Sequence, residues 1–256
     1  MPERIRTALI AGVLFGIILF FAPHILWIAL IFVGFAVCVK EWLKLCGYTS
    51  WKAISLTLIV TISGSVLFFS IGTTEFNHWR WLIYIDILFW TVLAPFWLIR
   101  TFMFRNWFLA LLGIILLYPF VLSLLFLRDI SPLILLRYMA VLWVSDTFAY
   151  FSGRVLGRHK LAPAISPGKT WEGVAGGMIA VAVYAIVVNW PLSGIIQTCG
   201  MLVMAAIGII GDLFESMVKR RANVKDSGSL LPGHGGLLDR LDSQIAALPL
   251  ALLLIR

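Results

Sequence analysis

The segment from Ser216 to Asp242 holds the chain's densest group of side chains that could do chemistry. It combines lysines and arginines with three aspartates, a histidine and four glycines, in a chain that is otherwise largely apolar. Asp212 and Glu215 come just before it, at the end of an apolar segment. Charged side chains at the edge of a membrane are costly and usually functional. Carboxylates together with cations bind divalent metals and phosphates, so the segment predicts a phosphate-handling site in a membrane protein.

The first part of this region has helical spacing. Asp212, Glu215, Ser216 and Lys219 fall at i, i+3, i+4 and i+7, which is one stripe of a helix. Two carboxylates and a hydroxyl on one face could bind a metal and a substrate. The basic residues that follow, Arg220 among them, could instead hold anionic lipid headgroups, at about 1 kcal/mol per charge.

The second part is rich in glycine and leads into another helix. Lys225 and Asp226 precede a Pro-Gly-His-Gly-Gly run that contains His234. Glycines let the backbone approach a ligand closely and adopt conformations with positive φ. Asp239 and Asp242 follow at i and i+3, so they share a helix face. A histidine beside three glycines and two aspartates indicates a site rather than an ordinary loop.

A further carboxylate lies upstream, near the end of an apolar segment. Asp146 and Tyr150 are four residues apart and share a helix face. A neighbouring hydroxyl or lysine could simply satisfy the carboxylate. An unpaired carboxylate in lipid costs about 3 kcal/mol or more, which favours a functional role for Asp146.

A polar loop between residues 153 and 173 contains a Gly-Lys-Thr run that is not a P-loop. The P-loop motif requires glycine at position 163, where this chain has Pro163, and a preceding strand, which we do not expect here. Ser166 begins a turn, and Lys169 is a cation suited to phosphate. We expect Thr170 to help cap a helix that begins at about Trp171, where exposed N–H groups suit an anion. The loop could equally be a basic segment that only sets membrane topology.

The combined residue types suit phosphoryl or nucleotidyl transfer. Asp212 and Asp239 fall at the ends of two different helices and could converge on one Mg²⁺, which takes one or two protein carboxylates plus phosphate oxygens. Such transfer depends mainly on positioning and charge neutralisation. Four histidines and three scattered cysteines lack the ligand spacing of a zinc site. Membrane topology explains the basic residues, so no nucleic-acid partner is expected.

Long apolar segments must position these groups. Of the 256 residues, 61% are hydrophobic and only 12% are charged, about half the charge of a soluble domain. Lipid tolerates only helices or closed barrels, and continuous apolar runs exclude a barrel. We therefore expect an all-α polytopic membrane protein with about nine transmembrane helices. The segments are roughly 5–21, 25–39, 54–72, 81–99, 107–127, 132–151, 172–190, 194–213 and 237–255.

The distribution of basic residues predicts the orientation. With the N-terminus in the cytoplasm, sixteen lysines and arginines lie inside and four lie outside, namely Arg80, Arg128, Arg137 and Arg256. This asymmetry follows the positive-inside rule. The loops near 152–171 and 214–236 then face the cytoplasm, where nucleotides are found. Short loops and this bias indicate a multi-pass protein of a bacterial inner (plasma) membrane.

The polar positions between residues 143 and 250 resemble the signature of the phosphatidate cytidylyltransferases. The first 140 residues match that family only as a hydrophobic pattern. The matching positions are Asp146 to Tyr150, Ser166 to Gly173, Gly211 to Ser216, Lys219, Arg220, Lys225, Asp226, Pro232, His234 to Gly236, Asp239, Arg240 and Asp242.

The resemblance implies an enzyme that joins CTP and phosphatidic acid into CDP-diacylglycerol and releases pyrophosphate, in phospholipid biosynthesis. It also implies Mg²⁺ dependence, a homodimer, and a cavity open to both cytoplasm and membrane lipids. Asp212 and Asp239 correspond to the metal aspartates of that family. We expect residues 1–140 to provide packing, dimer contacts and lipid access. Residues 141–256, with their two cytoplasmic loops, are expected to form the catalytic site.

The mechanism that we expect is in-line attack of the lipid phosphate on the α-phosphorus of CTP. Mg²⁺ on Asp212 and Asp239 would neutralise the developing charge, and His234 could donate a hydrogen bond to the departing pyrophosphate. Ser166 and Ser216 are expected to bind substrate. Two larger sets complete the site: a phosphate clamp of Lys169, Lys219, Arg220, Lys225 and Arg240, and carboxylates that orient ligands or bind a second cation, Asp146, Asp226 and Asp242.

Other classes fit the sequence less well. A transporter would more often show broken helices and internal repeats. A CTP-dependent polyprenol kinase shares nucleotide and membrane but would release CDP instead of pyrophosphate. The CDP-alcohol phosphotransferases need an Asp-Gly pair, and the chain contains none. A purely structural role leaves the polar loop unexplained.

Overall fold

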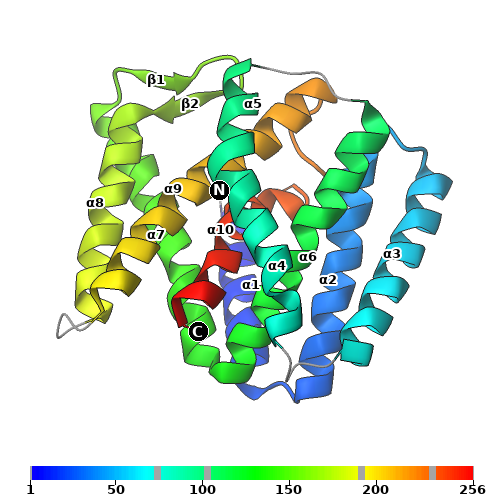
Figure 1. Cartoon of the computed structure of the whole chain (residues 1–256). Coiled ribbons are helices and arrows are strands. Elements are labelled where there is room, and N and C mark those ends of the chain that lie inside the picture. The colour runs from blue at the N-terminus through cyan, green and yellow to red at the C-terminus, as the bar shows by residue number, and fades with distance from the viewer. Residues whose placement is uncertain (1, 72–75, 101–104, 190–193, 231–234, 256) are drawn as a thin grey trace.

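The fold is a bundle of long helices with a small β-hairpin at one end (Figure 1). The computed structural model describes residues 2–71, 76–100, 105–189, 194–230 and 235–255. Its elements are α1 (Pro2–Phe21), α2 (His24–Leu45), α3 (Ser50–Ile71), α4 (Phe76–Leu88), the π-helical turn η1 (Phe89–Leu93), α5 (Ala94–Arg100), α6 (Asn106–Ile130), α7 (Pro132–Leu156), β1 (Lys160–Ala162), β2 (Ser166–Thr170), α8 (Trp171–Val188), α9 (Ile195–Arg221) and α10 (Leu238–Ile255).

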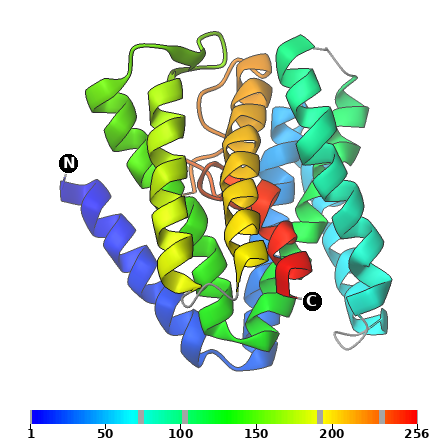
Figure 2. The same ribbon diagram turned by 60° about the vertical axis from the view of Figure 1, so that its left-hand side comes forward.

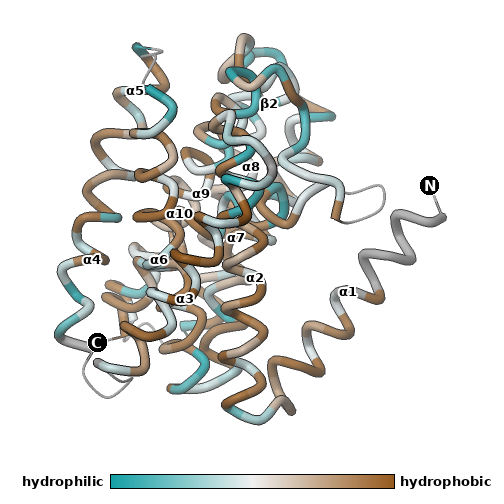
Figure 3. The backbone as a smooth tube through the Cα atoms, turned by 90° about the vertical axis from the view of Figure 1, so that its right-hand side faces the viewer, coloured by the Kyte–Doolittle hydropathy of each residue, from teal (hydrophilic) through white to brown (hydrophobic). Residues whose placement is uncertain are grey.

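Each predicted apolar segment coincides with a helix, and the segment expected at 81–99 is the continuous run of α4, η1 and α5. Seven helical segments among the described residues are long and apolar enough to cross a membrane. The apolar part of α1 is shorter, Gly12–Phe21, and α10 begins with charged residues. Brown, apolar colour dominates the long helices in Figure 3. The all-α polytopic class is therefore confirmed, whereas the number of helices that cross the bilayer and the side of the N-terminus stay predictions.

Two helices that carry the predicted site, α9 and α10, lie at the centre of the bundle beside α6. Buried residues make up 67% of the apolar window of α6 and 61% of that of α9, against 17% for α3. α10 packs against both α9 and α6. At the periphery, α3 exposes apolar side chains, as lipid contact requires, and α1 diverges from the bundle toward its N-terminus (Figure 2). The site is thus built partly on enclosed helices, α9 and α10, and partly on the more exposed α7 and hairpin.

An aromatic cluster sets the rotation of α9. The ring of Phe214 is buried against Trp42 of α2, with centroids 6.5 Å apart, and against Phe89 and Trp90 of η1 at 5.4 and 5.5 Å. Residues two positions apart on a helix differ by about 200° in direction. Packing Phe214 into this cluster therefore turns Asp212 toward the opposite side of α9.

α7 and α8 approach closely because α8 presents glycines to α7. A Cβ at Gly177 would lie 2.8 Å from the carbonyl oxygen of Ser145, and a Cβ at Gly173 would lie 2.8 Å from that of Ala149. Both distances are below van der Waals contact, so only glycine permits this separation. The close pair fixes the start of α8, and with it the end of β2, against α7.

The hairpin β1–β2 was not predicted, and the expectation that no strand precedes the Gly-Lys-Thr run was wrong. The two strands are antiparallel, with Lys160 opposite Thr170 and Ala162 opposite Ser166. The two strands are short and show no alternation of apolar and polar residues, and β2 contains Pro167 and Gly168, so the local signal for a strand was absent. The exclusion of a P-loop still holds, because Pro163 occupies the required glycine position.

Candidate active site

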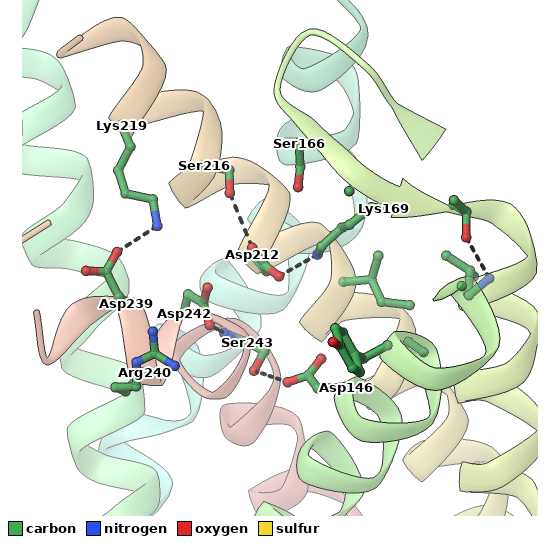
Figure 4. A pocket seen from close by; sticks show the side chains of 18 of the residues that line it. Asp146, Ser166, Lys169, Asp212, Ser216, Lys219, Asp239, Arg240, Asp242 and Ser243 are labelled. Carbon is green, nitrogen blue, oxygen red and sulfur yellow. Dashed lines mark hydrogen bonds and ion pairs between the residues drawn. The ribbon is translucent and has the colours of Figure 1, made fainter. Parts of the chain in front are cut away.

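The predicted site residues line one cavity of about 980 Å³ between α7, the hairpin, α9 and α10 (Figure 4). This volume is at the upper end of the range for small-molecule sites. His234 lies outside the described residues. The predicted residues that line the cavity are Asp146, Ser166, Lys169, Asp212, Ser216, Lys219, Arg220, Lys225, Asp226, Asp239, Arg240 and Asp242.

The hairpin is fastened to α9 across this cavity. Lys169 Nζ lies 2.5 Å from Asp212 Oδ2, and Arg220 Nε donates to the carbonyl oxygen of Ile165 at 3.3 Å. Thr170 caps α8 as predicted, because its hydroxyl accepts a hydrogen bond from the amide of Gly173 at 3.1 Å. The cap ends β2 and begins α8 at one residue, which fixes where Lys169 enters the site.

Three members of the predicted α9 stripe face the cavity. Ser216 Oγ donates to Asp212 Oδ1 at 3.3 Å, and Lys219 Nζ lies 2.7 Å from Asp239 Oδ1 on α10. Glu215 does not line this cavity; it is buried beneath it, beside the aromatic cluster, with its carboxylate 3.5 Å from Lys219 Nζ. The stripe therefore divides into a cavity face and a buried carboxylate that balances the charge of Lys219.

Asp239 is held by the segment that precedes α10. Its Oδ2 accepts hydrogen bonds from the amides of Ser227 and Gly236, both at 2.8 Å, and from Ser227 Oγ at 3.0 Å. Gly235 has φ +85°, which turns the chain so that the next amide can reach the carboxylate. Lys219, Gly236 and Ser227 together donate four hydrogen bonds to Asp239, and these bonds stabilise its charged form.

Asp146 and Asp242 join α7 to α10 on the far side of the cavity. Ser243 Oγ donates to Asp146 Oδ2 at 3.3 Å, and the Ser243 amide donates to Asp242 Oδ1 at 2.7 Å. Asp212 is close enough to both carboxylates to repel them electrostatically. The cavity thus brings the carboxylates of Asp146, Asp212, Asp239 and Asp242 together with lysines, an arrangement that suits a cation bridging to phosphates.

The carboxylate oxygens fit Mg²⁺ by type, but Asp212 and Asp239 differ in how many hydrogen-bond partners already occupy their oxygens. Both oxygens of Asp239 are engaged, one by Lys219 and the other by three donors. Asp212 has one partner on each oxygen, Lys169 and Ser216, so each oxygen keeps a lone pair. No group of three or more histidine, cysteine or acidic residues arranged to hold a metal occurs among the described residues. The Mg²⁺ site stays a prediction, and Asp212 is its best-prepared ligand.

Three residues of the site region were not among the candidates predicted from the sequence. Arg154 and Lys160 line the cavity from α7 and β1, whereas the sequence indicated them only as basic residues that set topology. Glu41, near the end of α2, is buried and bonded to the segment that holds Asp239. An acidic residue inside an apolar helix was itself a signal of function.

Comparison with known proteins identifies the family. The profile of the cytidylyltransferase family matches residues 2–256. The phosphatidate cytidylyltransferase of Haemophilus influenzae is 50% identical over 126 residues, which cover 46% of this chain and 44% of that protein. The enzyme of Pseudomonas aeruginosa is 42% identical over 121 residues, which cover 45% of each chain. That of Bacillus subtilis is 47% identical over 113 residues, which cover 43% of this chain and 42% of that protein. The alignments thus span less than half the length of these relatives. Because the family profile covers nearly the whole chain, this protein belongs to the cytidylyltransferase family.

Proposed function

We propose that this protein transfers the cytidylyl group of CTP to phosphatidic acid and so forms CDP-diacylglycerol and pyrophosphate. The observation that carries the proposal is the cavity itself, in which the predicted phosphate cations and carboxylates lie together at one end of an apolar bundle. Membership of the cytidylyltransferase family and the names of its relatives support the choice of CTP and phosphatidate.

The two sides of the cavity differ in a way that divides the cations between the substrates. Arg154 and Lys160 lie on the side of α7 and the hairpin, together with the half-exposed aromatic rings of Trp143 and Tyr150. Aromatic side chains beside cations suit a phosphate at the membrane interface. We assign this side to the lipid phosphate. The triphosphate would lie on the other side, which carries Lys219, Lys225 and Arg240, and Arg220, which contacts the hairpin, would lie between the two phosphates.

In the proposed reaction, an oxygen of the lipid phosphate forms a bond to the α-phosphorus of CTP. The bond from that phosphorus to the β-phosphate bridge breaks, and pyrophosphate carries away the electron pair. Lys169 lies at the junction of the two sides, where an incoming phosphate oxygen can replace Asp212 as its partner. Asp212 would hold Mg²⁺, with Asp239 as second ligand once Lys219 turns to phosphate, and this ion would neutralise phosphate charge.

The remaining polar residues, the membrane orientation and the assembly state complete the proposal. Asp146 and Asp242 would orient the cation or bind a second one, and Ser166 and Ser216 would donate hydrogen bonds to phosphate oxygens. The cavity would face the cytoplasm of a bacterial inner membrane, as the distribution of basic residues indicates. The homodimer implied by the family resemblance stays a prediction.

The test uses the purified full chain in micelles that contain phosphatidic acid, with Mg²⁺ and CTP labelled at the α-phosphate. Label should move into the lipid phase with an equal amount of pyrophosphate, and Asp239→Asn should lose this transfer. Asp129→Asn is the matched control, because Asp129 pairs with His24 (3.0 Å) and does not line the cavity. Absence of label from the lipid, or CDP as the soluble product, would refute cytidylyl transfer.

A further inference from the structure

Glu41 is a buried carboxylate whose bonds all go to the segment that leads into α10. Its side chain is on α2 and only 7% exposed. Oε1 accepts from the amide of Leu237 at 3.2 Å, and Oε2 accepts from the amide of Leu238 at 2.9 Å and from Ser227 Oγ at 3.2 Å. Within the described residues, no lysine, arginine or histidine lies within ion-pair distance of it. Among the described residues, hydrogen-bond donors therefore stabilise this buried charge.

These bonds connect Glu41 to Asp239 in two ways. The amides of Leu237 and Leu238 open α10, so the carboxylate sits at the positive end of that helix. The hydroxyl of Ser227 lies between the two acids, 3.2 Å from Glu41 Oε2 and 3.0 Å from Asp239 Oδ2. The Ser227 hydroxyl thus connects Asp239 to Glu41, although Glu41 comes 186 positions before Ser227 in the chain.

The backbone just after Ser227 and just before Leu237 is packed directly onto this carboxylate. A Cβ at Gly228 would lie 2.3 Å from Glu41 Oε1, and a Cβ at Gly236 would lie 2.5 Å from Glu41 Oε2. A side chain at either position would force the Glu41 carboxylate to move. Residues 223–226 are exposed, whereas Ser227 is buried, so the chain turns inward at the point where it meets Glu41.

We infer that Glu41 is a positioning residue, which holds Ser227 and the start of α10 against α2 so that Lys225 and Asp239 face the cavity. An apolar side chain would fill the same space at lower cost if packing were its only role, since burying a carboxylate is expensive. The consequence for catalysis rests on the proposed function, whereas the local effect on the segment does not.

The first measurement is amide hydrogen exchange on the full chain in detergent, for Glu41→Gln and Ser227→Ala beside the wild type. A glutamine keeps the shape but replaces one acceptor oxygen with an NH₂ group that faces N–H donors. Exchange in the peptides that carry the amides of Ser227, Gly236, Leu237 and Leu238 should become about tenfold faster, while α6 peptides exchange as in the wild type. Ser227→Ala tests the same link with a smaller change, should Glu41→Gln fail to fold.

The second measurement is equilibrium binding of radiolabelled CTP with Mg²⁺, together with the half-saturating CTP concentration for transfer. Both the dissociation constant and the half-saturating concentration should rise about tenfold or more. The effects of Glu41→Gln and Ser227→Ala should be less than additive in the double variant, because both changes remove the contact between Glu41 and Ser227. A merely structural role would reduce the active fraction without changing these concentrations. Asp86→Asn is the control, because Asp86 is also a buried carboxylate, bonded to Trp90, but does not line the cavity.

Wild-type exchange in both variants, or faster exchange with unchanged CTP affinity, would overturn the inference. If the wild type transfers no cytidylyl group, the proposed function fails on its own, and the exchange rates still decide whether Glu41 holds the segment.

Discussion

Replacing Lys219 by methionine should destabilise the protein strongly, because one ammonium balances two buried carboxylates. Its Nζ lies 2.7 Å from Asp239 Oδ1 and 3.5 Å from Glu215 Oε2. The side chains of Lys219, Asp239 and Glu215 are only 11%, 4% and 5% exposed. Methionine has nearly the same length and fills the space, so the change removes the charge without opening a cavity.

The expected loss follows from leaving Glu215 without its cation and Asp239 without one of its four hydrogen bonds. Removing one partner of a buried ion pair costs about 3–5 kcal/mol, whereas a surface ion pair is worth about 0–1 kcal/mol. For a chain of this size each kcal/mol lowers the melting temperature by about 2–4 °C. We therefore expect a fall on the order of 10 °C. Adding Glu215→Gln to Lys219→Met should restore part of it, because one buried charge is then removed.

The assay is thermal unfolding of the full chain in one detergent, followed by intrinsic tryptophan fluorescence. Lys44→Met is the matched control, since Lys44 is exposed on α2 and such substitutions usually stay within about 0.5 kcal/mol. A melting temperature for Lys219→Met that equals that of Lys44→Met would refute the claim that Lys219 neutralises a buried acidic pair.

Three further changes test other parts of the structure. Thr170→Val should lower stability by about 1 kcal/mol because it removes the cap on the Gly173 amide; Thr170→Ser, which keeps the hydroxyl, should melt like the wild type, and equal losses in both would contradict the cap. Gly177→Ala should lower the free energy of unfolding by about 1–3 kcal/mol because its Cβ would lie 2.8 Å from the Ser145 carbonyl oxygen. The control Gly16→Ala, whose Cβ would have nothing within 4 Å, should leave stability unchanged. Thermal unfolding of the two variants tests this difference. Lys169→Ala should raise the half-saturating CTP and phosphatidate concentrations about tenfold or more with an unchanged melting temperature; wild-type kinetics would exclude Lys169 from phosphate binding.

Local sequence signals determined the helices and the identity of the site. Continuous apolar runs in a chain this poor in charge have few folds open to them other than membrane-length helices, so the class and the approximate positions of all the long helices could be predicted. The polar islands stood out because charge in such a chain is costly. Thr170 as a cap also depends only on its immediate neighbours, and the structure confirms it.

Tertiary packing decided which of these groups meet. The sequence indicated that Lys169 and Asp212 belong to the site, but nothing local showed that they pair, or that the 160–170 segment forms a hairpin that α9 holds in place. Glu215 shares a helical stripe with Asp212, yet the aromatic cluster at Phe214 draws that side of α9 into the core.

Glu41 shows most clearly that local sequence does not reveal which residues pair. Its residue type in an apolar helix signalled a cost, but its partners lie nearly two hundred residues later, in a segment whose own sequence suggests only a loop. Apolar periodicity reports how each helix buries its own surface. The partner of a buried carboxylate depends instead on how several helices pack together, and only the folded chain determines that arrangement.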